Sequence, residues 1–326
     1  MALLAALTGT AAMAGIGTPW HWIAFLLFVL LALALDLGVF HRNAHSVRWR
    51  EAAAWSLVWV AISVLFGLGI LRWYGTQPTL EYFTGYVIEK SLSVDNLFVF
   101  LIVFRTFQVD ARYQHRILGW GILGALVMRG VLIAAGVALL ARFAWITYLF
   151  GGFLLYAGLH MLVAREKEAH PEQNIIFRFA KKHLRVAAKY HDARFFIREG
   201  GRWLATPLFL VLLVIETADV TFALDSIPAV FGITRDPFIV FTSNVFAILG
   251  LRALYFLLAG VLDYFSYLST GLALVLLFIG GKMIAEPWMH IPVHFSLAIV
   301  GGILLAALLA SLLRPPRKAD APAEKT

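Results

Sequence analysis

Two segments of the chain carry carboxylates inside long apolar runs. Glu89 and Asp95 lie in the first segment, and Glu216, Asp219 and Asp225 lie in the second. Each ionised carboxylate at the centre of a bilayer opposes insertion by about 3 kcal/mol, so together they oppose it by roughly 15 kcal/mol if the costs add. A chain that retains such a set is expected to use it, and a cation is the obvious partner.

The neighbouring residues indicate which kind of cation. Asn96 and Ser226 follow the last aspartate of each segment, and the chain contains no cysteine that could supply a thiolate. Carboxylate, amide and hydroxyl oxygens suit hard divalent ions such as Mn²⁺, Mg²⁺ or Ca²⁺. The predicted metal ligands are Glu89, Asp95, Asn96, Glu216, Asp219, Asp225 and Ser226.

A purely structural role is the alternative for these acids, because buried charges usually pair. Arg129 and Arg252 lie in apolar runs and are available to pair with Asp95 and Asp225. Glu89 has a second alternative, a local pair with the adjacent lysine at position 90. Both roles are compatible, because an arginine that exchanges with the metal ion would enforce its release.

Composition defines the class of protein. The chain has 326 residues, of which 61% are hydrophobic and 14% charged, whereas about a quarter of a soluble protein is charged. This predicts an all-α polytopic membrane protein that forms a single transmembrane domain. We find neither a catalytic arrangement nor a phosphate-binding loop, so we expect no enzyme, no cofactor and no direct use of ATP. The net charge of +8 is concentrated in a few loops, which argues against nucleic acid as a partner.

A membrane-spanning helix needs about 20 apolar residues, and the chain contains about nine such stretches. They are predicted at residues 22–40, 52–74, 80–104, 116–140, 144–163, 204–231, 237–259, 268–286 and 291–313. The predicted organisation is an outer tail at 1–21, five spans within 22–163, a basic loop at 164–203, four spans within 204–313 and an inner tail at 314–326.

The distribution of lysine and arginine predicts the orientation. One set of connections carries 20 of these residues and the other set carries 3. By the positive-inside rule the N-terminus is periplasmic and the C-terminus cytoplasmic. The first 20 residues carry no lysine or arginine, so we interpret them as an unprocessed tail and not as a signal peptide. The basic loop is expected to form amphipathic helices held at anionic lipid.

The two acidic segments resemble each other and suggest an internal repeat. Glu89 and Asp95 are six residues apart, as are Asp219 and Asp225. The segments fall in the third and sixth predicted spans, which cross the membrane in opposite directions. We therefore predict an inverted repeat of three helices, spans 3–5 against spans 6–8. Such repeats place a substrate site near the midplane at their interface.

Pro228 is expected to break the helix that carries the second segment. Proline cannot donate to the carbonyl four residues earlier and clashes with it, so the break is predicted near Leu224 to Ser226. A break there would re-aim Asp225 toward the other acids.

Several of these blocks resemble the TerC family of membrane proteins, over about residues 22–313. The blocks are EKSLSVDN at 89–96, ETAD at 216–219, DSIPA at 225–229, LDLGVFHR at 35–42, FTSN at 241–244 and LGLRALY at 249–255. The chain length and the long basic loop are most similar to the Alx-type bacterial members. The resemblance implies a protein of the bacterial inner membrane, linked to manganese export and historically to tellurite resistance. It also implies that the acidic residues of the family correspond to Glu89, Asp95, Glu216, Asp219 and Asp225, together with Asp36.

The expected function is therefore that of a secondary transporter that exports Mn²⁺ from the cytoplasm, with exchange for protons as a hypothesis. Its partners would be a divalent metal ion, protons and membrane lipid, and the sequence does not specify an oligomeric state. The alternative is a membrane scaffold that transports nothing and serves the biogenesis or metalation of exported proteins. Amide substitutions of the acids separate the two functions, because scaffolding should survive them and transport should not.

Overall fold

The computed structural model describes residues 15–40, 49–163, 186–187, 194–199, 202–258 and 267–313, without the side chains of residues 36–40, 49, 95 and 98. Most of the basic loop, the C-terminal tail and the side chains of Asp36 and Asp95 therefore lie outside the described residues. The amphipathic helices expected in the basic loop concern residues 175–187, which lie outside the description except for the last two.

The predicted all-α membrane fold is confirmed. Lipid offers no hydrogen-bond partners, and a helix satisfies its backbone internally. The helices are α2 (Pro19–Phe40), α3 (Trp49–Tyr74), α4 (Thr76–Thr106), α5 (Ala111–Arg142), α6 (Ile146–Val163), α8 (Pro207–Phe231), α9 (Pro237–Leu249), α10 (Leu251–Leu258), α11 (Leu268–Ala285) and α12 (Val293–Leu313).

The number of spans depends on how α2, α4 and the bent pair α9–α10 are treated. Among the described residues, six helices are long and apolar enough to cross a membrane, and the α9–α10 pair, bent by 40°, makes a seventh. The stretch of α2 whose side chains are described, Pro19–Leu35, is apolar but stops before the end of the helix at Phe40, and α4 contains the charged residues Glu89 and Lys90. Nine spans therefore remain a prediction.

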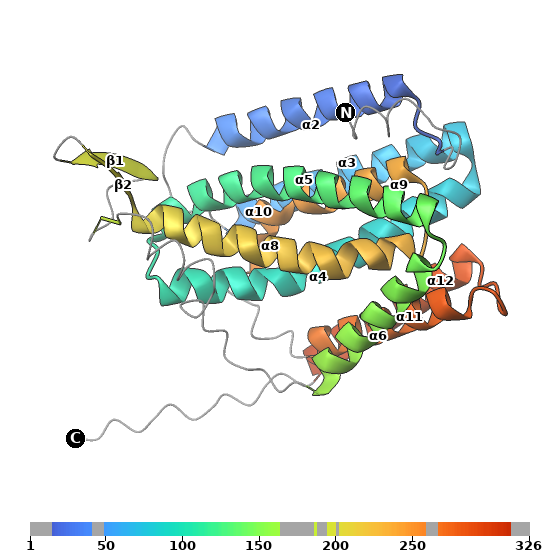
Figure 1. Ribbon diagram of the computed structural model, residues 1–326. Coiled ribbons are helices and arrows are strands. Elements are labelled where there is room, and N and C mark those ends of the chain that lie inside the picture. Colours follow the sequence, from blue (N-terminus) through green and yellow to red (C-terminus); the bar gives the residue numbers. More distant parts are fainter. Residues whose placement is uncertain are drawn as a thin grey trace.

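The part of the basic loop that the structure describes forms a small hairpin. Strands β1 (Phe196–Glu199) and β2 (Arg202–Ala205) pair antiparallel, with Phe196 opposite Ala205. Figure 1 shows this hairpin at one end of the bundle, while the connections α3–α4, α8–α9 and α11–α12 lie at the other end. The helices thus separate this hairpin from the connections that the sequence predicts to face the periplasm.

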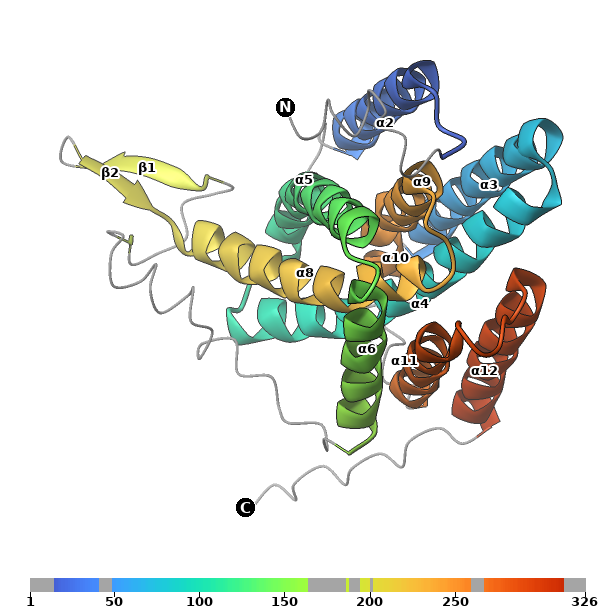
Figure 2. The ribbon, with the colours of Figure 1, turned by 45° about the vertical axis from the view of Figure 1, so that its right-hand side comes forward.

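The first helix of each predicted repeat packs against the second helix of the other repeat. Helices α4 and α8 cross near the centre of the bundle (Figure 2), α4 packs on α9, α8 packs on α5, and α6 packs on α11. If α4, α5 and α6 correspond to α8, α9–α10 and α11, the first helix of each repeat contacts the second helix of the other. This is the pattern expected of halves related by a two-fold axis, and it supports the predicted repeat.

The predicted helix break at Leu224 to Ser226 is wrong. Helix α8 continues from Pro207 to Phe231 with Pro228 inside it. Pro228 lies in the last turn, so it removes one hydrogen bond from a helix that is about to end. The bend occurs instead at Gly250, between α9 and α10.

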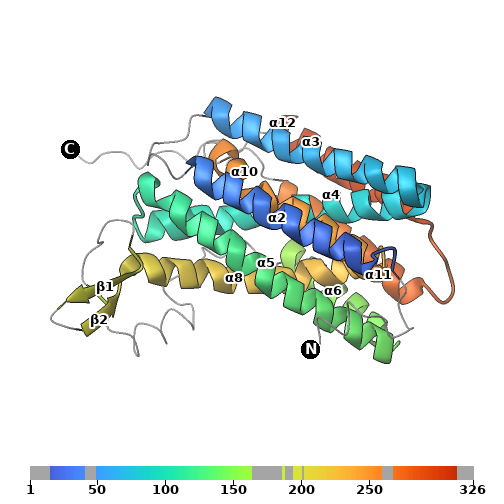
Figure 3. The ribbon, with the colours of Figure 1, turned by 90° about the horizontal axis from the view of Figure 1, so that it is seen from above.

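Helix α2 lies along one side of the bundle (Figure 3). Its Phe25 ring packs on Phe66 of α3 and on Phe246 of α9, with 5.6 Å between ring centroids in both cases. This aromatic layer separates α2 from the polar centre formed by α4, α5, α8 and α9.

Candidate cation site

Arg129 of α5 is the centre of a buried polar cluster. Its Nη1 atom donates to Ser226 Oγ and to Asn244 Oδ1, each at 3.3 Å, and forms an ion pair with Glu89 Oε1. Glu89 is 0% exposed and Arg129 is 3% exposed. Three oxygens from helices α4, α8 and α9 therefore meet at one nitrogen from α5.

Two further carboxylates of α8 extend this cluster. Asp219 is buried and lies within electrostatic range of both Arg129 and Glu89. Glu216, one helical turn earlier, is half-buried and lies within electrostatic range of Asp219. A spacing of three residues places both on one face of an α-helix, so their relation is a direct consequence of the sequence.

Close helix packing makes room for Glu216. Its carboxylate lies against Gly124 of α5, at the position that a Cβ atom of residue 124 would take. A second close approach involves Gly85 of α4, where an added Cβ would lie 2.9 Å from Ser243 Oγ of α9. Glycine thus allows α5 and α9 to reach the acidic helices.

Several polar atoms of the cluster are buried without a hydrogen-bond partner among the described residues. They are Glu89 Oε2, Glu216 Oε2, Asn244 Nδ2 and Arg129 Nε. A buried polar group without a partner costs about 1–3 kcal/mol and more when it is charged. The oxygens of this set therefore retain lone pairs that a cation could use.

A cavity of about 10 Å³ lies beside Asp219, and Arg252 of α10 also lines it. A space of this size holds about one water molecule. Both arginines that the sequence places inside the membrane thus lie near Asp219. Arg129 is within electrostatic range of it, and Arg252 lines the same cavity.

Of the predicted ligands, Glu89 and Ser226 both contact Arg129, while Asp219 and Glu216 lie within electrostatic range of this cluster but form no hydrogen bond or ion pair with it among the described side chains. Asn96 is buried on α4 and Asp225 is half-buried on α8, but among the described side chains no hydrogen bond or ion pair joins either residue to the cluster. The Asp95 side chain lies outside the description. Within the described ranges, no three aspartate, glutamate or histidine side chains converge closely enough to hold a metal ion, so the complete ligand set remains a prediction.

The structure also tests part of the alternative in which the buried charges pair with one another. Arg129 does form a buried ion pair, but with Glu89 and not with Asp225. Lys90 donates to the Ala247 carbonyl oxygen at 3.2 Å, so Glu89 is not paired with its neighbour. Both contacts join α4 to the helices that surround it, which sequence spacing along a single helix does not reveal.

Asn244 is a site residue that the ligand prediction missed. Thr242, Ser243 and Asn244 of α9 are all at most 1% exposed. The signal that could have found it is this run of three polar residues inside an apolar span, since buried polar side chains in lipid face other protein groups.

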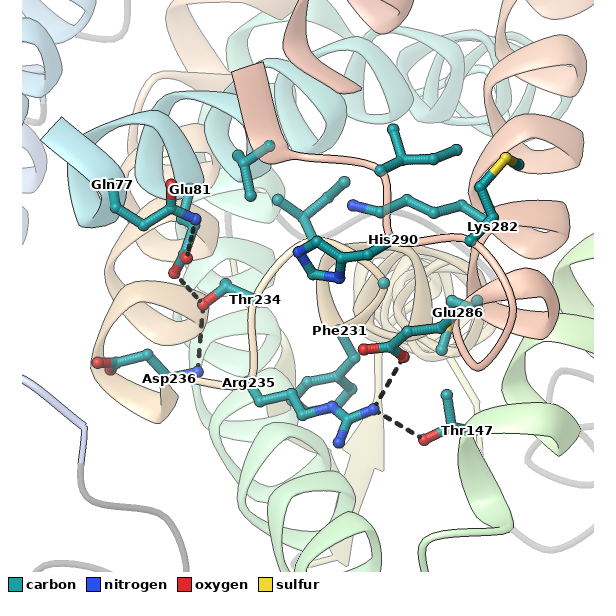
Figure 4. A pocket seen from close by; sticks show the side chains of 16 residues that line it. Gln77, Glu81, Thr147, Phe231, Thr234, Arg235, Asp236, Lys282, Glu286 and His290 are labelled. Carbon is teal, nitrogen blue, oxygen red and sulfur yellow. Dashed lines mark hydrogen bonds and ion pairs between the residues drawn. The ribbon is translucent and has the colours of Figure 1, made fainter. Parts of the chain in front are cut away.

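A second polar pocket lies at the end of the bundle opposite the β-hairpin. It has a volume of about 350 Å³ and lies between the start of α4, the α8–α9 connection and the end of α11. Figure 4 shows Thr234 donating to Glu81, and Arg235 bridging Thr147 and Glu286. The Lys282 Nζ atom, on α11, donates to Ser296 Oγ at 3.0 Å.

The contact between Gly124 and Glu216 gives a first prediction. We expect Gly124→Ala to leave the fold intact, because the Glu216 side chain is flexible enough to move, but to weaken the binding of a divalent cation by turning that carboxylate away from Asp219. The measurement is a titration of the purified protein with Mn²⁺. Gly130→Ala is the matched control on the same helix, because its added Cβ would make an ordinary contact of 3.5 Å with Phe241. Equal affinities of both variants for Mn²⁺ would show that the position of Glu216 does not matter.

The fold and the buried charges define a polytopic integral membrane protein with a polar site inside its helix bundle. Residues 74–319 match the integral membrane protein TerC family, and the chain belongs to this family. It is 50% identical to an uncharacterized membrane protein of Myxococcus xanthus over 311 residues. The matched region covers 94% of this chain and 98% of the relative. It is 47% identical over 304 residues to the putative membrane-bound redox modulator Alx of Escherichia coli K12, over 90% of this chain and 94% of the relative. No solved structure matches the chain significantly.

Proposed function

We propose that this protein is a secondary transporter that exports Mn²⁺ from the cytoplasm through the Arg129 cluster. One observation carries the proposal: the buried residues Glu89 of α4 and Ser226 of α8, one from each predicted repeat, meet at the same nitrogen of Arg129. Carboxylates in lipid are costly and typically mark ion pathways. The choice of Mn²⁺ among the hard divalent ions rests on the resemblance to TerC proteins.

The ion would enter from the cytoplasmic side and exchange part of its water shell for the oxygens of α4 and α8. It would leave when the two repeats rock against each other, as in other transporters built from inverted repeats. The pocket around Glu81 is the proposed exit, because Glu81 precedes Glu89 by eight residues on α4, or about 12 Å at 1.5 Å per residue. The proposed orientation, with the N-terminus in the periplasm of a bacterial inner membrane, rests on the distribution of lysine and arginine.

Exchange of Mn²⁺ for protons is part of the proposal, because neighbouring carboxylates raise one another's affinity for protons. The test is Mn²⁺ flux into proteoliposomes with and without a pH gradient. A flux that ignores the gradient would rule out proton coupling. Metal content measured element by element, in cells with and without the protein, tests the choice of ion.

The relatives named redox modulators suggest a further constraint. The chain has no cysteine, so it has no thiol chemistry of its own. A redox effect would be compatible with the proposed transport, because manganese is itself redox-active.

The aspartates that end the two acidic segments provide a second prediction. We expect Asp95→Asn and Asp225→Asn each to abolish the Mn²⁺ tolerance that the protein confers, because an amide keeps the shape but loses the charge that binds the ion. Growth of a manganese-sensitive strain measures tolerance, and immunodetection in the membrane fraction checks insertion.

Asp110→Asn is the matched control for these variants. Asp110 is an exposed residue that caps α5 by accepting from the Arg112 backbone N–H, and asparagine caps helices equally well. Full tolerance in the Asp95 or Asp225 variant would remove that residue from the site. If every inserted amide variant keeps its phenotype, the protein acts as a scaffold and not as a transporter.

A further inference from the structure

The guanidinium of Arg129 holds the oxygens that a divalent cation would need. We propose that Arg129 is a tethered competitor of the transported ion: it binds Glu89, Ser226 and Asn244 when the site is empty, and leaves them when the metal enters. This inference rests on the proposed function and concerns how the same site takes up and releases its ion.

The geometry of the contacts is that of a site for a single atom. An arginine that pairs with a carboxylate commonly uses two parallel N–H groups, one for each oxygen. Here Glu89 Oε1, Ser226 Oγ and Asn244 Oδ1 all meet Arg129 at Nη1, and Arg129 Nε has no partner among the described residues. A convergence of three oxygens on one point suits a monatomic cation better than it suits the planar guanidinium.

The carboxylate retains capacity for such a cation. Glu89 is 0% exposed, and its Oε2 atom has no hydrogen-bond partner in the described part of the chain. Its single ion pair therefore leaves half of a fully buried carboxylate unsatisfied. A metal ion could bind both Glu89 oxygens, and Asp219, which is also buried on α8, would add a second negative charge to its surroundings.

The charges make the two cations mutually exclusive. Glu89 and Arg129 together are neutral, and a divalent ion placed among the same oxygens would lie within a few ångströms of the guanidinium. Like charges repel strongly at that distance in a medium of low dielectric constant. Metal binding must therefore displace Arg129, and the return of Arg129 to Glu89 must favour release. The empty carrier could then reorient with the Glu89 carboxylate still paired.

Metal affinity in variants of Arg129 tests this mechanism on the full-length protein in lipid nanodiscs. Free Mn²⁺ is followed by its electron paramagnetic resonance signal during titration. We expect Arg129→Gln to lower the Kd for Mn²⁺ by about tenfold or more, which corresponds to about 1.4 kcal/mol, and Arg129→Lys to lower it less, because lysine keeps the charge but loses the guanidinium's reach. In proteoliposomes Arg129→Gln should bind tightly yet transport slowly, because release loses its competitor.

Arg142→Gln is the matched control, since Arg142 is an exposed arginine at the end of the same helix; its Kd should equal that of the wild type. A structural ion pair predicts instead that Arg129→Gln lowers only the unfolding temperature, and an unchanged or higher Kd in a folded Arg129→Gln protein overturns the inference. If that variant does not fold, the Kd of Arg129→Lys decides, and a value equal to the wild type overturns it. Wild-type protein that moves no Mn²⁺ contradicts the proposed function, whereas wild-type transport with an unchanged Kd in the variants contradicts this inference alone.

Discussion

Replacement of Glu89 by glutamine is expected to reduce Mn²⁺ flux in proteoliposomes to background and to lower the free energy of unfolding by about 3–5 kcal/mol. The first effect follows from the loss of a buried carboxylate that both repeats surround. The second follows because Arg129, only 3% exposed, would keep its charge without the acid that neutralises it. Flux assays and thermal unfolding in detergent measure the two effects separately.

The double variant Glu89→Gln with Arg129→Gln separates transport from stability. Two neutral amides can hydrogen-bond to each other, so the double variant should regain most of the stability that Glu89→Gln loses. Its Mn²⁺ flux should remain at background, because no carboxylate has been restored. Wild-type flux in Glu89→Gln would contradict the placement of the site, and a double variant that is less stable than both single variants would contradict the ion pair.

Gly280→Ala, which adds one methyl group, should lower the free energy of unfolding by about 1–3 kcal/mol, as overpacking of a tight contact does. The backbones of α6 and α11 touch here, because an added Cβ on Gly280 would lie 2.8 Å from the Gly151 carbonyl oxygen and 3.0 Å from the Leu155 backbone nitrogen. Neither atom can move without separating the helices. In lipid, such close contacts between small residues are a main source of helix association, so thermal unfolding of Gly280→Ala measures the strength of this contact.

Gly281→Ala is the adjacent control with the opposite expected sign. An added Cβ at Gly281 meets no atom within 4 Å, and alanine is favoured over glycine inside a helix by up to about 1 kcal/mol. Gly281→Ala should therefore unfold at the same or a higher temperature than the wild type. If both variants lose the same stability, the effect belongs to this segment of α11 in general and not to its contact with α6.

The sequence predicted those features of the site that depend on residue spacing within a single helix. Glu216 and Asp219 are three residues apart, and helical geometry alone places them on one face. A charged side chain in lipid is costly, so Glu89 and Arg129 could be predicted to lie inside the bundle and to be functional. The predicted break at Pro228 failed because a proline in the last turn of a helix disturbs little, whereas the bend at Gly250 has no such marker in the sequence.

The contacts between helices could not be predicted in the same way. Several acids in the sequence could pair with Arg129, and its pairing with Glu89 depends on how α8 and α9, which pack on both α4 and α5, hold those two helices relative to each other. Asn244 joins the cluster because α9 packs on α4, and Gly280 contacts Gly151 because α6 and α11 come together from distant parts of the chain. Each of these pairings joins residues that no local spacing relates.

The amino-acid sequence by itself determined that this chain is a helical membrane protein with acidic residues in two segments, because apolar length and the cost of buried charge act residue by residue. Tertiary structure alone decided that Glu89, Ser226 and Asn244 meet at the guanidinium of Arg129. The reason is that the crossing of α4, α5, α8 and α9 is set by the summed packing of many small contacts, and only that packing fixes which polar atoms share one point inside the membrane.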